Sequence, residues 1–406
     1  MKMFCNQCEQ TFGGMGCTVK GVCGKDSETA LLQDLLIFAL KGIAVYGYRV
    51  RPLGIIDTEC DHFISEGLFS TVTNVNFDRQ RLRELINKAY ELKEKMKLKF
   101  LKEYRKNYGK EFADQLPELV NWIPADNIEG LINHAKDVGV AVEEGVNQDI
   151  ISLREILLFG LKGMAAYCDH AFILGYQDEE VSFFFYKGLD ALADNSLSTD
   201  DLLALIMEFG KVNLRCLELL DKAHNNHFGS PALKKVSLGV KKGPAIIVSG
   251  HDLYDLKQLL EQTEGKGINV YTHGEMLPAH GYPELNKYPH LAGHFGTAWQ
   301  NQHREFDAVP AGILFTTNCI QKPKDSYKDR VFTTGLVAWP QVKHIYADSG
   351  KKDFTPLINK ALSLGGFDSD NIEKEITVGF GHNMVLTLAD KIIEAVKSGK
   401  IKHFFL

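Results

Sequence analysis

The sequence predicts a multi-domain protein of the α plus α/β class, in which an N-terminal helical domain of two related bundles precedes parallel α/β domains. Three observations support this: a helical apolar period through the first half, an internal repeat within it, and a change near residue 244 to short β-branched runs that alternate with helices. At 406 residues the chain fits two or three domains. We place them at 1–239, 240–368 and 369–406.

The first half is predicted to be helical because apolar residues recur at i, i+3, i+4 and i+7, for example over 82–104 and 202–223. LQDLLIFALKGIAVY (32–46) and LREILLFGLKGMAAY (153–167) share eight identities in fifteen aligned positions at an offset of 121. A repeat of this length indicates two related helical bundles.

A Lys-Gly pair lies inside each copy of this repeat, at Lys41-Gly42 and Lys162-Gly163. Glycine inside a helix costs about 1 kcal/mol relative to alanine unless close packing compensates. We therefore expect both glycines to pack against a neighbouring helix.

The second half contains short strands followed by helices. The predicted strands are 244–250, 268–274, 312–318, 343–347, 375–381 and 401–406, and the predicted helices are 252–262 and 383–397. This alternation is typical of parallel α/β sheets, whose ligands gather beyond the carboxyl ends of the strands.

Composition and charge narrow the class of protein. Hydrophobic residues make up 45% of the chain and charged residues 24%, and the net charge of −6 with dispersed basic residues argues against a nucleic-acid partner. The most apolar stretch, from Leu31, is interrupted by Asp34 and Lys41, which argues against a bilayer span. No signal peptide precedes Cys5, so we expect a cytoplasmic protein with no membrane partner, whose cysteines are reduced thiols or metal ligands.

Four cysteines, Cys5, Cys8, Cys17 and Cys23, follow the spacing C-x2-C-x8-C-x5-C. Zinc usually takes two compact ligand pairs, and here the second pair is widely spaced. A disulfide needs an oxidising compartment. An iron–sulfur cluster needs four thiolates on a permissive loop, and five glycines provide such a backbone, at 13, 14, 16, 21 and 24. The spacing favours the cluster, with zinc and a disulfide as alternatives.

Three more potential metal ligands follow predicted strands: His251, Glu275 and Cys319. A common parallel sheet would bring them to one edge. Imidazole, carboxylate and thiolate together suit iron better than magnesium or calcium. Each residue also has an ordinary interpretation: His251 supports the turn before Asp252, a predicted helix N-cap, Glu275 is solvated, and Cys319 is a small buried hydrophobe.

The other histidines and cysteines are assigned structural places. We expect most of the nearby histidines to be surface residues or outer partners of metal ligands; they are His273, His280, His290, His294 and His303. Three cysteines without paired spacing are predicted to be core residues: Cys60, Cys168 and Cys216.

These motifs together resemble the hybrid cluster protein family, also called the hydroxylamine reductases. The resemblance runs nearly end to end and is carried by MFCNQCEQTFGGMGCTVKGVCGK, LQDLLIFALKGIAVYG, SGHDLYDLKQLLEQTEGKGINVYTHGEMLPAH, TTNCI, PKDSYKDR and HNMVLTLADKIIEAVKSG. It implies a helical domain of two three-helix bundles and two Rossmann-like α/β domains, akin to nickel carbon monoxide dehydrogenases.

The resemblance also implies two clusters. The first is a 4Fe-4S electron-relay cluster on Cys5, Cys8, Cys17 and Cys23. The second is a 4Fe-2O-2S hybrid cluster that would take His251, Glu275 and Cys319 as ligands. The family supplies three further cysteines and a glutamate from a region after residue 406, and this sequence has no cysteine beyond Cys319. We therefore expect the 406 residues to be part of a longer polypeptide.

The function implied is the reduction of hydroxylamine to ammonia, with electrons from an unidentified donor protein. Glu275 is the candidate for a ligand that moves between redox states, because carboxylate binds iron less tightly than thiolate. The alternatives are nitric oxide reduction to nitrous oxide, a nitric oxide or redox sensor that uses an exposed thiol such as Cys60, and a zinc-stabilised structural protein.

Overall fold

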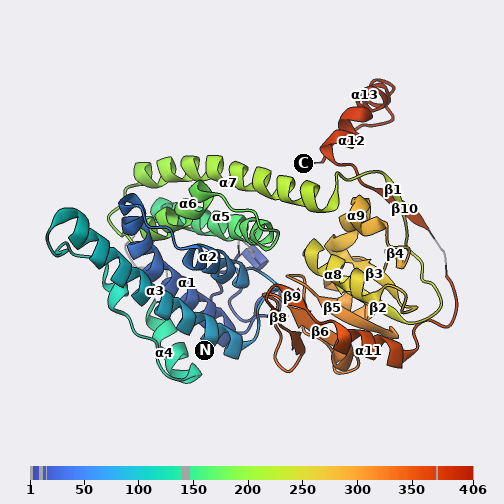
Figure 1. The fold of residues 1–406 in the computed structure, drawn as a ribbon, viewed down its shortest axis with the longest axis horizontal. Helices are drawn as coiled ribbons and strands as arrows, with labels where there is room; N and C mark the ends of the chain where they lie inside the picture. The colour runs from blue at the N-terminus through green and yellow to red at the C-terminus, as the bar shows by residue number, and fades with distance from the viewer. Residues whose placement is uncertain (1–2, 9–11, 15, 139–146, 372–373, 406) are drawn as a thin grey trace. The chain divides into compact units, whose positions relative to one another are not determined.

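The computed structural model describes residues 3–8, 12–14, 16–138, 147–371 and 374–405. The chain packs into two units, and each is described by itself (Figure 1). The helical unit contains 1–221 together with 317–322 and 333–344. The α/β unit contains 222–316, 323–332 and 345–406.

The helical unit is built from long amphipathic helices. They are α1 (Ser27–Val50), α2 (Thr58–Ser70), α3 (Arg79–Tyr108), α4 (Ile128–Val138), α5 (Gln148–Ile173), α6 (Glu179–Ala191) and α7 (Thr199–Phe228), the last of which continues past residue 221. Aspartate caps the N-terminus of several of them, and the side chains of Asp26, Asp57, Asp78 and Asp178 accept hydrogen bonds from first-turn amides. Both copies of the repeat are helical, in α1 and α5, as the sequence predicts. Their division into two bundles stays a prediction.

Helix α1 forms the centre of this unit. It packs against α3, α4 and α6, while α2 packs against α5. By length and composition, Ser27–Leu53 and Gln148–Ile173 could each cross a membrane, with 83% and 44% of their apolar windows buried inside the protein. The core helices of soluble proteins pass the same test, and the burial of α1 is that of a core helix.

The two repeat glycines differ in their surroundings. A Cβ on Gly42 would stand 3.1 Å from Cδ of Lys93, so close packing explains that glycine. A Cβ on Gly163 would meet nothing within 4 Å in the described part of the chain, and the residue is exposed. The packing prediction is therefore confirmed for Gly42 and wrong for Gly163.

The α/β unit contains strands β4, β3, β2 and β5, the first four of a six-stranded sheet of order β4-β3-β2-β5-β6-β7 (Figure 1). The strands are β2 (Ala245–Ser249), β3 (Asn269–His273), β4 (Leu291–His294), β5 (Ala311–Phe315), β6 (Val331–Thr334) and β7 (Lys343–Ile345). Strand β2 pairs in parallel with β3 and β5, and β3 pairs in parallel with β4. Apolar β2 and β5 are buried along their whole length, as expected for central strands.

Helices follow or cover these strands. They are α8 (Leu253–Thr263), α9 (Pro283–Asn286), α10 (Gln302–Glu305) and α11 (Thr355–Leu364). Helix α11 packs on β5 and β2. Short 3-10 helices connect elements of both units, at η1 (Phe12–Gly14), η2 (Arg51–Leu53), η3 (Glu118–Asn121), η4 (Gly274–Gly281), η5 (Trp299–Asn301) and η6 (Lys328–Arg330).

The last part of the chain departs from the predicted pattern. Strand β10 (Glu375–Val378) pairs antiparallel with β1 (Lys234–Ser237), and β8 (Ala347–Asp348) pairs antiparallel with β9 (Lys351–Lys352). The predicted helix over 383–397 is divided at Leu388 into α12 (His382–Thr387) and α13 (Ala389–Lys397). The predicted strand at 401–406 is wrong over its described residues 401–405, which form no strand.

Candidate metal-binding sites

The four N-terminal cysteines lie on one loop that the backbone folds back on itself. The amide of Cys5 donates to the carbonyl of Cys17 at 3.0 Å, and the two residues form an antiparallel bridge. Cys17 is buried, whereas Cys5, Cys8 and Cys23 are half-buried. The bridge thus places Cys5 opposite Cys17, and three of the four cysteines are partly exposed.

The predicted glycines of this loop serve two purposes. Four adopt positive φ, at Gly13, Gly14, Gly16 and Gly24, where larger residues would be strained. Gly21 is required for a different reason, because a Cβ there would stand 3.3 Å from Sγ of Cys23. Glycine therefore leaves room at this sulfur.

Lys25 places a positive charge next to the thiols. It is 1% exposed, and its Nζ donates to the carbonyls of Thr71 at 2.8 Å and Val72 at 3.2 Å. Burial raises the pKa of the Cys5 thiol, and the charge of Lys25 opposes that shift. Burial lowers the pKa of Lys25, and Cys23, Cys5 and Cys8 oppose that in turn. Because metal binding needs thiolates, a buried ammonium group here favours the ligating form.

Two of the predicted strand-end ligands are in contact. Ser249 ends β2 and is paired with His273, which ends β3, so the residues two positions further on emerge side by side. Nε2 of His251 lies 2.7 Å from Oε2 of Glu275. Their side chains are 33% and 64% exposed, so the pair is open to an incoming ligand.

The ordinary interpretation of His251, support of the turn before Asp252, explains only part of what the structure shows. Asp252 caps α8, as predicted, and its side chain accepts from the amides of Tyr254 and Asp255. The cap is made by Asp252 alone, while the ring of His251 turns to Glu275. The cap thus fixes the backbone next to His251.

Cys319 follows the third strand of this edge. Phe315, the last residue of β5, is also paired with Ser249, and Cys319 lies four residues beyond it. The loop 317–322 packs with the helical unit, where Asn74 and Ile320 exchange hydrogen bonds of 2.9 and 3.3 Å. Cys319 is 6% exposed and has φ of 86°. For a residue other than glycine, this left-handed backbone conformation costs about 1–3 kcal/mol of folding free energy. Residues strained in this way cluster at functional sites.

The histidines behind the pair form a buried polar network. His273 contacts Oγ of Ser249 at 3.1 Å through Nδ1 and Oε2 of Glu305 at 3.2 Å through Nε2. His280 and His294 both contact Oγ1 of Thr272 at 2.9 Å.

Burial lowers the pKa of His280 and of His294 to about 4, so both rings are neutral near pH 7. A surface position is therefore wrong for His273, His280 and His294, whereas His290 is half-buried and His303 is exposed. Only the contact distances reveal this network, because the sequence does not show that Thr272 faces His280 and His294 or that Glu305 faces His273.

Of the three remaining cysteines, Cys60 and Cys216 are buried core residues, as predicted, whereas Cys168 is half-buried and packs against the core. Cys60 is fully buried, and burial, assisted by the charge of Asp57, raises its pKa to about 12. A hydrogen bond to Cys216, followed by burial, raises the pKa of Cys168 well above its ordinary value. The raised pKa values of Cys60 and Cys168 are the opposite of the low pKa that a redox sensor needs.

A cluster that the sequence analysis does not predict is formed by His62, Glu66 and Asp169, whose ligand atoms lie within 4.8 Å of one another. Nε2 of His62 is 3.0 Å from Oδ1 of Asp169, and its ring stacks on Phe172 with 3.6 Å between centroids. His62 and Glu66 are one helical turn apart on α2, whereas Asp169 comes from α5. The pair of His62 and Asp169 joins these two helices.

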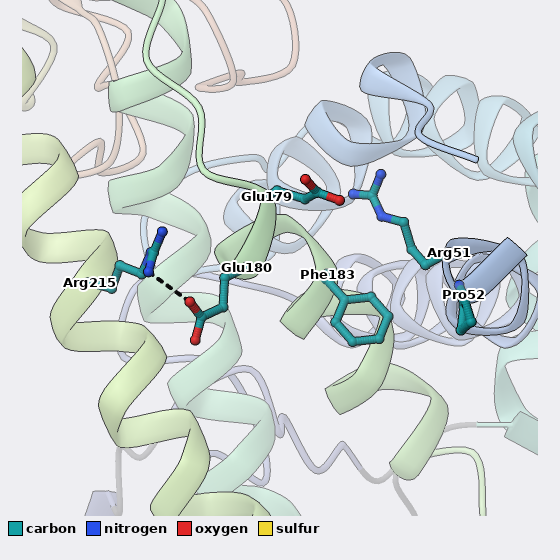
Figure 2. Close-up of a pocket in the computed structure, with 6 residues that line it drawn as sticks. All are labelled: Arg51, Pro52, Glu179, Glu180, Phe183 and Arg215. Carbon is teal, nitrogen blue, oxygen red and sulfur yellow. Dashed lines mark ion pairs between the residues drawn. The ribbon is translucent and has the colours of Figure 1, made fainter. Parts of the chain in front are cut away.

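A surface pocket of the helical unit contains none of the predicted ligands (Figure 2). Its lining residues are Arg51, Pro52, Glu179, Glu180, Phe183 and Arg215. Arg215 is paired with Glu180 at 2.8 Å and with Asp178 at 2.7 Å. Mixed, mutually paired charges of this kind are typical of a solvated surface.

Comparison with known proteins identifies the family. The model of the Prismane/CO dehydrogenase family matches residues 3–406. A hydroxylamine reductase of Kosmotoga olearia is 51% identical over the whole of this chain and 72% of its own length, and one of Geobacter metallireducens is 50% identical over the whole chain and 73% of its length.

Among solved structures, a Ni-free carbon monoxide dehydrogenase from Thermococcus sp. AM4 matches 98% of this chain and 62% of its own, with 16% identity and a TM-score of 0.39. Carbon monoxide dehydrogenase IV from Carboxydothermus hydrogenoformans matches 96% and 60%, with 14% identity and the same TM-score. The family match and the relatives are sufficient: this chain belongs to the Prismane/CO dehydrogenase family and is an iron–sulfur oxidoreductase.

Proposed function

We propose that this protein reduces hydroxylamine to ammonia. The observation that carries the proposal is the contact of His251 and Glu275 at the aligned ends of β2 and β3, in a chain half identical to hydroxylamine reductases. The reaction takes up two electrons and two protons, breaks the N–O bond and releases ammonia and water. It therefore needs a path for electrons and an open site where a small substrate meets metal.

The N-terminal loop fits an electron-relay cluster of the 4Fe-4S type. Four thiolates are the donor set that such clusters require, and Cys5, Cys8, Cys17 and Cys23 occupy one folded-back loop. The buried ammonium of Lys25 offsets part of their negative charge. When bound, this cluster would supply electrons one at a time.

The strand-end residues fit the second, 4Fe-2O-2S hybrid cluster. His251, Glu275 and Cys319 would be its ligands in this chain and the catalytic residues of the reaction. The hybrid cluster would supply a Lewis acid and electrons. His251 and Glu275 offer imidazole and carboxylate at an accessible edge, and Cys319 would add a thiolate from a strained turn.

The surroundings of these ligands support precise placement. Ser249 and Glu305 fix both ring nitrogens of His273, the residue two positions before Glu275. The carboxylate of Glu275 is the more exposed partner, which suits a ligand that moves between redox states. We place the protein in the cytoplasm, where a separate donor protein would deliver the electrons to the N-terminal cluster.

The two alternative functions are nitric oxide reduction and the sensing of nitric oxide or redox state. Nitric oxide reduction to nitrous oxide would use the same open edge. A sensor that modifies partner proteins would need a reactive thiol outside the clusters, and the candidate Cys60 is buried with a pKa raised to about 12. The structure therefore favours an enzyme over a thiol sensor.

A steady-state assay tests the proposal. Protein purified without oxygen is assayed for iron and sulfide, then for oxidation of a reduced dye by hydroxylamine and, separately, by nitric oxide. We expect one ammonia for every two electrons taken from the dye. Nitrous oxide from nitric oxide at a higher kcat/KM, with no ammonia from hydroxylamine, would instead establish the nitric oxide reductase.

Glu275→Gln provides the matched test of the site. We expect it to reduce kcat by about tenfold or more, because a neutral amide is a weaker iron ligand than a carboxylate. Glu284→Gln, at an exposed residue paired with Lys287, should leave kcat unchanged. Equal activity of the two variants would remove Glu275 from the site.

A further inference from the structure

Gln7, between the proposed ligands Cys5 and Cys8, is held by two helices at once. It is 2% exposed. Its backbone oxygen and its Oε1 accept hydrogen bonds from Nζ of Lys162 at 3.0 and 2.6 Å. Its Nε2 donates to Oδ1 of Asp34. The cysteine loop is therefore fixed to α1 through a carboxylate and to α5 through an ammonium group.

Both charged groups lie away from water. Lys162 is 2% exposed and Asp34 is 7% exposed. Both hydrogen bonds of Lys162 go to the amide groups of Gln7, which are neutral. Burial, followed by the charge of Lys25, lowers the pKa of Lys162 to about 7, and the negative charges of Asp34 and of the cysteine loop oppose this shift. An ammonium group buried in this way needs negative charge nearby, and four ligating thiolates would provide it.

Each copy of the internal repeat has a lysine at the same position, and the two lysines differ in their surroundings. Lys41 holds the position in α1 that Lys162 holds in α5, at the repeat offset of 121. Lys41 is half-buried, and its pKa is lowered to about 8 by burial and then by the charge of Arg154, while the charge of Asp34 opposes this shift. The two repeat helices thus contribute different residues to Gln7. Helix α1 provides the carboxylate of Asp34, and α5 provides the ammonium group of Lys162.

We propose that Lys162 is a positioning residue of the N-terminal cluster and sets its reduction potential. Its Nζ holds Gln7, and with it the turn from Cys5 to Cys8. Its positive charge stabilises the reduced cluster, because reduction adds one electron to a group surrounded by thiolates, and the buried ammonium group has little water around it to screen its charge. Asp34 acts in the opposite direction from the other end of the Gln7 amide. The inference rests on the proposed function, since it requires a cluster on the four cysteines.

Redox titration of the whole protein, followed by electron paramagnetic resonance, measures the effect. The signal that Cys17→Ser loses identifies the N-terminal cluster. Lys162→Met keeps the length of the side chain and removes the charge, so we expect its midpoint potential to become more negative than that of the wild type. Lys162→Arg should restore most of the difference, and Lys41→Met should match the wild type.

Asp34→Asn is a second variant, and the shift expected in its midpoint potential has the opposite sign to that of Lys162→Met. It removes a negative charge and keeps the shape, so the midpoint should become more positive even if Lys162→Met does not assemble. The inference is overturned if the midpoint of either charge variant equals that of the wild type with the cluster intact, or if Lys41→Met shifts as far as Lys162→Met. Wild-type protein with no iron and sulfide on the four cysteines would instead disprove the cluster assignment in the proposed function.

Discussion

At the residue scale, His62 shows how one side chain can make stability depend on pH. Burial alone would lower its pKa, but the hydrogen bond and charge of Asp169, together with Glu66, outweigh burial and raise it. A raised pKa in the folded state means that the stabilisation is complete below the unfolded value of about 6.5 and disappears as the pH rises through the folded value.

The prediction concerns the difference in free energy of unfolding between the wild type and His62→Gln. We expect this difference to be largest near pH 6, at about 1 kcal/mol or less, and to shrink toward pH 8. Urea titrations at several pH values measure it. In an Asp169→Asn background the pH dependence should be lost. A difference that stays constant over this range would mean that the charge of His62 contributes nothing.

At the element scale, the two repeat helices are packed differently enough for similar substitutions to have opposite effects. A Cβ on Gly47 in α1 would stand 2.1 Å from the ring of Tyr186, whose hydroxyl donates to Asp61 at 2.6 Å. Gly47→Ala should therefore cost about 1–3 kcal/mol through overpacking. A Cβ on Gly163 in α5 would meet nothing within 4 Å among the described residues, so Gly163→Ala should gain up to about 1 kcal/mol from helix propensity. Denaturant unfolding compares them, and similar effects of the two substitutions would contradict the packing described here.

The same helices show what periodicity can and cannot predict. The apolar period was sufficient to predict α1 and α5, because burial of one face determines it. Short continuous apolar runs predicted the buried strands β2 and β5. The apolar period could not distinguish Gly42 from Gly163. Whether a Cβ would fit at either position depends on the side chains of neighbouring helices, which the period does not show. Strand order placed His251 beside Glu275 in advance, because parallel strands in register end together. The antiparallel pairing of β10 with β1 is a long-range contact, and no local pattern predicts it.

The residues around the cysteine loop escaped prediction for a related reason. Asp34 and Lys162 were visible as charges inside apolar helices, and such charges usually signal a buried partner. Their partner, Gln7, lies far away in the sequence and has no distinctive spacing of its own. A charged residue within an apolar repeat is the signal that could have directed attention to this place.

At the scale of the whole molecule, the proposed clusters depend on different parts of the chain. The relay ligands lie within the first residues of the helical unit, whereas His251 and Glu275 follow strands of the α/β unit. Loss of one site should therefore leave the other intact. Cys17→Ser and Glu275→Gln are the two substitutions that separate them.

Cys17→Ser should remove the N-terminal cluster, because three thiolates and a weaker alkoxide seldom hold a cubane. About four irons per chain should be lost with it, and the second site should keep its spectroscopic signal. Turnover with a protein donor should then fall at least tenfold, because electrons can no longer enter through the relay, whereas a small dye that reaches the exposed edge directly should lose less. Glu275→Gln should do the reverse, with an unchanged N-terminal signal and an altered second one. If Cys17→Ser kept all its iron, or lost both signals together, the assignment of two separate sites would have to be abandoned.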